Sequence, residues 1–276
     1  MLKNIYNTYG RKKTYVYLKK KGMEFKIDME IILKDNERID DLEYKGLKII
    51  QDKSGFCFGI DSVLLSNFAR NIKKDCKVID LGTGTGIIPI LLSEKSYAKK
   101  IIGVEIQEEV ADMARRSVQL NNLQNKIEIL NENILNLRNI FKRNEFDVIV
   151  TNPPYKKINT GIVNKENKKI ISRHEITASL EDFIEISYYL LKDFGELYMI
   201  HRPERIVDII YNLRAKKIEP KNIRFVYPNK NKEPKLVLIK AVKNANPFLK
   251  IENNLYIKDE FENYTEEILK IYEKIK

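Results

Sequence analysis

The sequence is poor in cysteine and histidine, residues that commonly bind zinc and other transition metals. Its two cysteines, Cys57 and Cys76, show no C-x-x-C spacing, which excludes a disulfide framework and a cysteine zinc knuckle. The two histidines, His174 and His201, are too few for a histidine-rich metal site or a mechanism with several imidazoles. We therefore expect no bound metal and a reducing environment.

Long hydrophobic runs are also missing. No stretch of about 18 uncharged apolar residues exists to cross a bilayer, and the charged N-terminus lacks the apolar segment of a secretory signal. The 276 residues, 43% hydrophobic and 32% charged, nevertheless provide enough material for a globular core. We expect a cytoplasmic monomer that does not enter membranes.

Acidic residues are scarce in three segments, which concentrate the net charge of +11. Residues 1–26 carry eight basic residues against one acid, residues 156–173 carry six against one, and residues 214–243 carry ten against two. Such clusters can neutralise phosphates and attract a polyanion. A lysine-coated surface from an AT-biased coding sequence would produce the same counts. A basic cluster beside an active site is therefore a stronger indication of nucleic-acid binding than the net charge.

The first 30 residues show no clear helical or strand period. Two interpretations stay open for this basic, tyrosine-bearing arm. It binds nucleic acid as a disordered extension, or its start codon is assigned too far upstream, since Met23 and Met29 follow within it. The second interpretation is slightly favoured. The predicted layout places an arm over 1–30 and one domain over 31–276. That domain is divided into N-terminal strands and a helix over 31–76, a catalytic core over 77–243 and a tail over 244–276.

Strand-like and helix-like patterns alternate from Leu47 onward. This alternation predicts an α/β fold with a doubly wound, Rossmann-like, seven-stranded and mostly parallel sheet. The expected strands cover 47–50, 56–58, 78–81, 101–105, 127–130, 146–150, 195–200, 223–227 and 235–242. The expected helices cover 62–70, 87–94, 108–121, 180–191 and 203–213, with a short segment at 134–141.

Three local features refine this prediction. The last two strands have a short connection, which indicates an antiparallel hairpin at the sheet edge. Asp61 is a plausible N-cap for the helix over 62–70. Residues 156–179 show no strong period and are long for a loop in an α/β protein, which is typical of a substrate loop.

A glycine-rich turn, Asp80 to Gly86 (DLGTGTG), follows the first strand of the core and opens a helix. Glycines at alternate positions let the backbone approach a ligand at the carboxyl edge of the sheet. The spacing is G-x-G-x-G, which differs from the G-x-G-x-x-G of dinucleotide folds. The acid before the first glycine suits a cationic ligand, such as the ammonium group of S-adenosylmethionine, better than a phosphate.

Glu105 ends the next strand. An acid at this place in a βαβ unit can bind both ribose hydroxyls, in NAD folds and in S-adenosylmethionine folds alike. Glu105 therefore indicates nucleoside binding without selecting the cofactor.

The segment Asn152-Pro153-Pro154-Tyr155 follows a buried strand at the same sheet edge. The side-chain oxygen of Asn152 and the carbonyl of Pro153 can each accept a hydrogen from a planar exocyclic amine, whose lone pair is delocalised into its ring. Both bonds would hold the nitrogen in line with a methyl group, so positioning and charge stabilisation supply most of the catalysis. Two prolines stiffen the loop, and Tyr155 offers an aromatic face for a planar substrate.

These motifs resemble those of class I S-adenosylmethionine-dependent methyltransferases of the NPPY amino-group type. Within that group the chain resembles the bacterial tRNA(Val) (adenosine-37) N6-methyltransferase family, from about Leu33 to the C-terminus. Further similar features are Gln51, 56–65 (FCFGIDSVLL), Arg173-His174-Glu175, His201 to Glu204 (HRPE), Leu255 to Ile257 and Tyr264 to Glu267.

The resemblance implies S-adenosylmethionine as cofactor, tRNA as partner, and adenine N6 as methyl acceptor. It places Asp80, Gly82 and Gly84 at the methionine end of the cofactor, Glu105 at its ribose, and 152–155 at the target base. The predicted cofactor set is Asp80, Gly82, Thr83, Gly84, Gly86, Glu105, Ile106 and Asn133. The predicted catalytic set is Asn152, Pro153, Pro154 and Tyr155, with Lys156, Lys157, Lys168, Lys169, Arg173 and His174 as RNA contacts.

The chain departs from the family pattern at two places. Asn133 stands where such enzymes commonly place an aspartate against the cofactor's adenine; the asparagine can still accept from the adenine amine but lacks the charge, which predicts a lower cofactor affinity. The basic arm over 1–30 has no counterpart in the family. No general base is assigned, since the amine can lose its proton to water after transfer. His201 is interpreted as a structural residue at a strand end, and an Arg173–Glu175 ion pair is the alternative to RNA contact.

Other functions remain open at this point. An N5-glutamine methyltransferase acting on a release factor uses the same asparagine chemistry, although fewer than 80 residues precede the glycine loop here to hold a protein substrate. Guanine-N2 methylation of ribosomal RNA also fits the NPPY segment. A non-catalytic RNA-binding protein and a nicotinamide dehydrogenase are the remaining alternatives. In the main interpretation, the basic segments 156–173 and 214–243 flank the base pocket.

Overall fold

The computed structural model describes residues 13–20, 23–53, 59–155 and 178–275. Its strands are β1 (Lys13–Lys20), β2 (Met23–Ile32), β3 (Glu37–Asp41), β4 (Lys48–Asp52), β5 (Lys77–Leu81), β6 (Lys100–Glu105), β7 (Ile127–Asn131), β8 (Phe146–Thr151), β9 (Leu191–His201), β10 (Ile218–Tyr227), β11 (Leu236–Lys243), β12 (Lys250–Ile251) and β13 (Leu255–Tyr256). Its helices are α1 (Ile60–Phe68), α2 (Ile87–Lys95), α3 (Glu108–Leu120), α4 (Leu137–Ile140), α6 (Leu180–Leu190), α7 (Ile206–Ala215) and α8 (Glu266–Ile271), with 3-10 turns η1 (Ile134–Asn136) and η3 (Pro203–Arg205).

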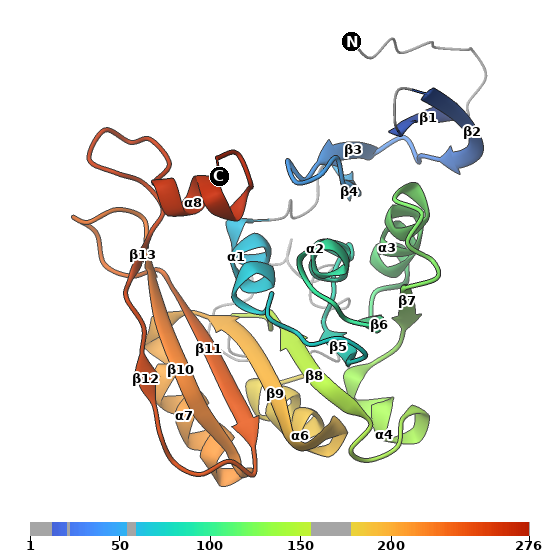
Figure 1. Cartoon of the computed structure of the whole chain (residues 1–276). Helices are drawn as coiled ribbons and strands as arrows, with labels where there is room; N and C mark the ends of the chain where they lie inside the picture. Colours follow the sequence, from blue (N-terminus) through green and yellow to red (C-terminus); the bar gives the residue numbers. More distant parts are fainter. Residues whose placement is uncertain (1–12, 21–22, 54–58, 156–177, 276) are drawn as a thin grey trace, which may run out of the picture.

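One sheet organises the molecule, in the order β12-β10-β11-β9-β8-β5-β6-β7 (Figure 1). Strands β7, β6, β5, β8 and β9 are mutually parallel, and β11 is inserted antiparallel between β9 and β10. The predicted α/β class with a mostly parallel sheet and the antiparallel hairpin near its edge are therefore confirmed, but the predicted count of seven strands is not, since the sheet of the described residues has nine. The two-residue strands β12 and β13, which also pair with β10, were not predicted.

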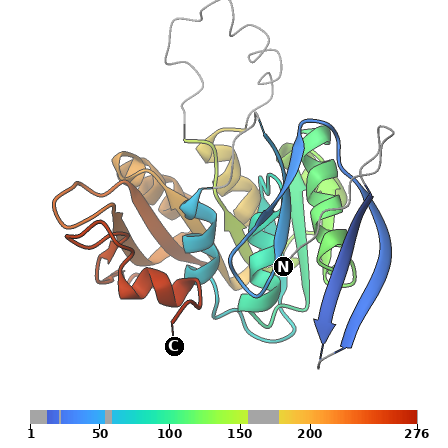
Figure 2. The ribbon, with the colours of Figure 1, turned by 90° about the horizontal axis from the view of Figure 1, so that it is seen from above.

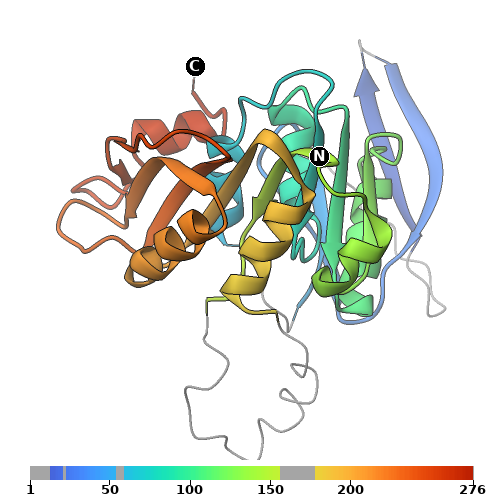
Figure 3. The same cartoon turned by 90° about the horizontal axis from the view of Figure 1, so that it is seen from below.

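Helices cover both faces of the sheet, as Figures 2 and 3 show from opposite sides. On one face, Leu64 of α1, Leu91 of α2 and Ala114 of α3 belong to one buried cluster. On the other face, Ile184 of α6 and Leu213 of α7 belong to a second cluster. Parallel sheets require strands that are apolar on both faces. The two buried clusters meet this requirement and hold the ends of neighbouring strands in register.

Two small antiparallel pairs precede the core. β1 pairs with β2, although residues 1–30 showed no strand period, and β2 contacts α3 (Figure 1). β3 pairs with β4, which attaches to α3 because the backbone N–H of Ile50 donates to Ser117 Oγ (2.9 Å). The domain boundaries predicted at residues 30, 76 and 243 stay a prediction.

Several predicted element ends differ from the structure. The helix expected over 62–70 begins at Ile60 after Gly59, so Asp61 lies in its first turn and is not the N-cap. The strand expected to begin at Gly195 begins at Leu191, directly after α6. The helix expected from Pro203 starts as the turn η3 before α7. The strand predicted over 56–58 lies outside the described residues.

Candidate active site

The carboxyl ends of three adjacent parallel strands bring the predicted residues together. Leu81 at the end of β5 is the register partner of Thr151 in β8 and of Val104 in β6. Thr151 also donates its hydroxyl to the Leu81 carbonyl (2.9 Å). The glycine loop, Glu105 and Asn152 therefore emerge side by side at one edge, the place where open α/β sheets bind ligands.

Asp80 is fully buried, and both oxygens of its carboxylate lack a hydrogen-bond partner among the described residues. The hydroxyl of Thr83, 3% exposed, likewise lacks one. Burial raises the pKa of Asp80 to about 7; the charge of Glu105 adds to the rise, and the nearby Thr83 hydroxyl opposes it. A buried carboxylate without partners among the described residues is costly in a native fold. The predicted contact of Asp80 with a cationic ligand would offset that cost and stays a prediction.

The glycine loop has a backbone that other residues adopt only with strain. Gly82, Gly84 and Gly86 have φ values of +75°, +57° and +87°. Gly86 directly precedes α2, and a Cβ on it would lie 3.2 Å from Cβ of Ala114 in α3. Glycine at these positions therefore meets a geometric requirement of the turn and leaves its backbone open to a ligand.

Glu105 binds the glycine loop. Its Oε2 accepts the backbone N–H of Gly84 (3.0 Å), and its Oε1 accepts that of Gln107 (2.9 Å). Burial raises the pKa of Glu105, while these backbone hydrogen bonds work in the opposite direction. Both oxygens retain lone pairs for ribose hydroxyls. Ile106 follows with 42% of its surface exposed, at the same edge.

Asn133 lies just beyond β7, at the same edge of the sheet. Its Oδ1 accepts the backbone N–H of Leu135 (3.0 Å) and so caps the turn η1. That oxygen already has one donor, and the nitrogen of the same amide carries two N–H groups. Its predicted contact with the cofactor's adenine stays a prediction.

The NPPY segment leaves β8 as an extended loop, with Pro153 buried, Pro154 exposed, and Asn152 and Tyr155 half-buried. The hydroxyl oxygen of Tyr155 lies 2.7 Å from Asp61 Oδ2 and 2.8 Å from Asn152 Oδ1. Burial, followed by the charge of Asp61, raises the pKa of Tyr155 well above its ordinary value, with Arg202 opposing. The side chain is therefore a neutral phenol.

His201, the last residue of β9, and Arg202, which follows it, both contact the Tyr155 ring. The Arg202 guanidinium lies 4.8 Å from the ring centroid, within cation–π distance. The His201 ring centroid lies 5.1 Å away. Burial lowers the pKa of His201 to about 4, and its Nδ1 accepts the backbone N–H of Arg202 (2.8 Å). His201 is thus neutral at physiological pH, and its structural role stays a prediction.

The structure adds Asp61 and Arg202 to the predicted set. Both occur in the segments that carry the family resemblance, FCFGIDSVLL and HRPE, but periodicity alone assigned Asp61 only a capping role. The predicted RNA contacts lie outside the described residues; they are Lys156, Lys157, Lys168, Lys169, Arg173 and His174. Within the described ranges, no cluster of three or more His, Cys, Asp or Glu residues could hold a metal ion, and no helix could cross a membrane.

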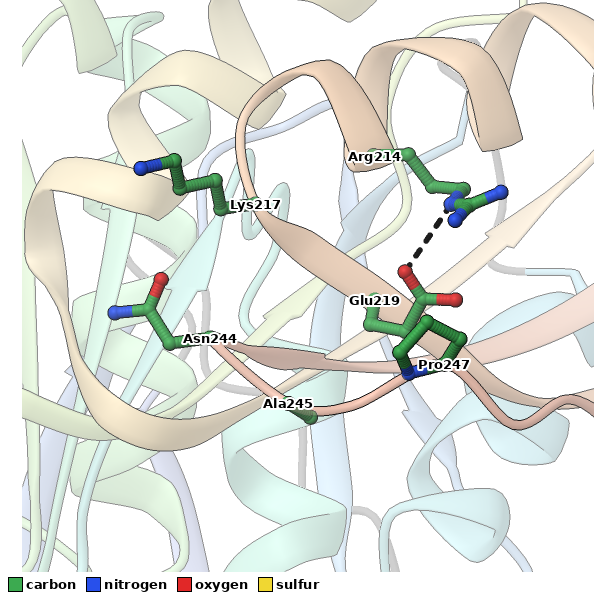
Figure 4. Close-up of a pocket in the computed structure, with 6 residues that line it drawn as sticks. All are labelled: Arg214, Lys217, Glu219, Asn244, Ala245 and Pro247. Atoms are coloured by element: carbon green, nitrogen blue, oxygen red, sulfur yellow. Dashed lines mark hydrogen bonds and ion pairs between the residues drawn. The ribbon is translucent and has the colours of Figure 1, made fainter.

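The basic segment 214–243 is only partly where it was expected. It forms the hairpin β10–β11, so its two ends meet at the amino edge of the sheet and its turn, with exposed Lys230 and Lys232, at the carboxyl edge. The ends border a pocket away from the glycine loop, in which Arg214 Nε donates to Glu219 Oε2 (3.2 Å; Figure 4). The pocket is lined by Arg214, Lys217, Glu219, Asn244, Ala245 and Pro247.

Comparison with known proteins yields one family and a consistent set of relatives. The family model described as "Methyltransferase small domain" matches residues 59–205, more than half of the chain. The tRNA1(Val) (adenine(37)-N6)-methyltransferase of Porphyromonas gingivalis is 29% identical over 206 residues, covering 72% of this chain and 79% of the relative. Enzymes of the same name from Parabacteroides distasonis (27% over 233 residues; 83% and 94%) and Histophilus somni (32% over 161 residues; 57% and 65%) also match.

Solved structures share the fold. A predicted O-methyltransferase, protein Atu636 from Agrobacterium tumefaciens, superimposes with a TM-score of 0.62 at 20% identity, covering 77% of this chain and 95% of that one. A putative transferase from Pyrococcus horikoshii gives a TM-score of 0.54 at 15% identity, covering 76% and 73%. At these identities the likeness concerns the architecture of the sheet and its helices.

Proposed function

This chain belongs to the methyltransferase small domain family, and from that premise we propose that it transfers the methyl group of S-adenosylmethionine to N6 of an adenine in tRNA. The relatives carry names that specify adenine 37 of tRNA1(Val), and we extend that target to this chain. The observation that carries the proposal is the Asp80 carboxylate on β5, which has no hydrogen-bond partner among the described residues and lies on the strand adjacent to β8 and its NPPY loop.

The residues at this edge fit the cofactor. Asp80 would hold the ammonium group, which would give its buried oxygens the charged partner that the described protein lacks. The positive-φ backbone at Gly82 and Gly84, which has no side chains, would let the cofactor approach closely. Glu105 would accept hydrogen bonds from the ribose hydroxyls. S-adenosylmethionine, when bound, supplies an electrophilic methyl group on a sulfonium centre.

The NPPY loop would prepare the nucleophile. Asn152 Oδ1 and the Pro153 carbonyl would each accept one hydrogen of the adenine amino group, which orients the nitrogen and stabilises the positive charge that it gains. The nitrogen then loses a proton to water. The Arg202 guanidinium lies 4.8 Å from the Tyr155 ring centroid. A stacked base would therefore use the ring face that Arg202 does not cover.

The RNA would reach this pocket by electrostatic attraction. Lys230 and Lys232 in the β10–β11 turn provide positive charge at the carboxyl edge, and the basic residues of 156–173 follow the NPPY segment directly in the sequence. An anticodon-loop adenine is a suitable target because an unpaired base enters a pocket at a lower energetic cost than a paired one.

A transfer assay tests the proposal. The purified protein is incubated with labelled S-adenosylmethionine and total tRNA from a strain that lacks the gene, and the nucleosides are separated by mass spectrometry. We expect the label in N6-methyladenosine. Label in another nucleoside would move the target, and label in a release-factor protein instead of RNA would replace the proposal with glutamine methylation.

A further inference from the structure

The hydrogen of the Tyr155 hydroxyl has two neighbours that can accept it. Asp61 Oδ2 lies 2.7 Å from the hydroxyl oxygen on one side, and the Asn152 side-chain amide lies 2.8 Å away on the other. The pKa of Tyr155 is raised, so the group carries one hydrogen and can donate it only once. A carboxylate is the stronger acceptor, because hydrogen bonds to ionised groups are roughly twice as strong as those between neutral groups.

The second contact then requires a hydrogen from the asparagine. With the Tyr155 hydrogen directed to Asp61, an amide oxygen facing the Tyr155 oxygen would place two acceptors together at 2.8 Å. A half-turn of the Asn152 amide exchanges its oxygen and nitrogen at nearly the same positions. The amide nitrogen then donates to Tyr155, and Oδ1 points away from Tyr155.

We propose that Asp61 is a positioning residue that acts through Tyr155 to orient the Asn152 amide, so that its oxygen and not its nitrogen is presented to the substrate amine. The inference rests on the proposed function in that it assigns Asn152 Oδ1 the role of acceptor. The opposite orientation would present an N–H group to an amine that itself has to donate, and the in-line geometry would be lost. Asp61 reaches the site from α1, 91 positions before Asn152 in the chain.

A double-mutant cycle separates this action of Asp61 on Asn152 through Tyr155, here called the relay, from general structural support. The variants are Tyr155→Phe, which keeps the ring but removes the hydroxyl, Asp61→Asn, which keeps the shape but removes the charge, and the double variant. We expect each single substitution to lower kcat, by about 10- to 100-fold, the range seen when a reacting group is misplaced. The KM for tRNA and the Kd for cofactor should stay within about twofold.

The decisive comparison is Asp61→Asn in the Tyr155→Phe background. Without the hydroxyl there is nothing to relay, so the double variant should have the kcat of Tyr155→Phe alone. An Asp61→Asn effect that is equally large in both backgrounds would overturn the proposal. Tyr198→Phe is the matched control, since Tyr198 is a buried tyrosine on β9 that donates to the Glu196 carboxylate (2.7 Å); its kcat should equal that of wild type.

A measurement without substrate keeps this test independent of the proposed function. In deuterated protein with ¹⁵N-labelled asparagine and protonated tyrosine, the Asn152 amide protons should show a strong NOE to the Tyr155 ring, and Asp61→Asn should weaken it. The Asn152→Ala protein assigns the signal. An NOE that is absent, or unchanged in Asp61→Asn, contradicts the relay. Wild-type transfer to something other than adenine, with the NOE present, would instead contradict only the proposed function.

Discussion

The backbone N–H of Gly84 donates a 3.0 Å hydrogen bond to Oε2 of Glu105, which ties the glycine loop after β5 to the end of β6. The other carboxylate oxygen accepts the backbone N–H of Gln107 at the start of α3. Glu105 is therefore a support for the loop as well as the predicted ribose ligand.

This dual role predicts a combined effect of Glu105→Ala. Each lost hydrogen bond to the charged carboxylate should cost about 1.5–3 kcal/mol of unfolding free energy, and cofactor affinity should fall at the same time. Urea denaturation and calorimetric titration measure the two effects. The control is Glu128→Ala, which breaks an exposed ion pair with Lys100 and should change stability by less than about 1 kcal/mol. Unchanged stability in Glu105→Ala would contradict the supporting role.

Asp80 should make the ligand-free protein less stable as the pH rises. Its pKa is about 7 in the folded protein, whereas an aspartate in an unfolded chain titrates near 4. Between these values the folded state binds more protons, so the stabilisation present below about pH 4 is lost as the pH approaches 7. We expect Asp80→Asn to lessen the stability difference between pH 4.5 and pH 7.5 by a few kcal/mol, at about 1.4 kcal/mol per pKa unit. If the unfolding free energies of wild type and Asp80→Asn change equally between pH 4.5 and pH 7.5, this prediction is contradicted.

The same group predicts how cofactor binding depends on pH. Only the ionised Asp80 carboxylate attracts an ammonium group, so affinity should rise about 16-fold between pH 5.5 and pH 7, for a group with a pKa near 7. The amino group of the ligand stays protonated over that range, because α-amino groups titrate near 8. Titration calorimetry should also detect proton release on binding. A flat profile in wild type, or the same slope in Asp80→Asn, would remove Asp80 from the cofactor site.

Asn152→Ala should separate catalysis from cofactor binding. Loss of the acceptor for the amine hydrogen should lower kcat by about 10²–10³-fold, the effect of removing one group that stabilises developing charge. The Kd for cofactor should stay within about twofold, since Asn152 is predicted to contact the base. Single-turnover kinetics measure the first quantity and calorimetry the second. Asn212→Ala on α7 is the control and should retain wild-type turnover; the account fails if Asn152→Ala does so too.

Much of the fold could be predicted from local patterns. The glycine loop, the alternation of strands and helices, and the hairpin β10–β11 all have signals within a few residues, and the structure has these elements near their predicted bounds. The start of β9 was missed because Gly195 resembles a boundary. In the structure, a Cβ at Gly195 would lie 2.9 Å from Cδ2 of Leu191, so glycine serves close packing inside the strand.

The site was predictable in composition but not in its contacts. Parallel strands place Asp80, Glu105 and Asn152 at one edge by topology, and this follows from sequence. The contacts of Tyr155 with Asp61 and Arg202 join segments that are far apart in the chain, and no periodicity encodes such pairs. That Asp80 has no hydrogen-bond partner among the described residues is likewise visible only in the folded structure.

The most direct test of the account uses two valine tRNA transcripts that differ at one nucleotide, adenine or guanine at position 37. The purified protein and labelled S-adenosylmethionine are incubated with each, alongside the Asn152→Ala protein. We expect stoichiometric label as N6-methyladenosine in the adenine transcript with wild type, and almost none in the guanine transcript or with Asn152→Ala. Equal labelling of the two transcripts, or full activity of Asn152→Ala, would contradict it.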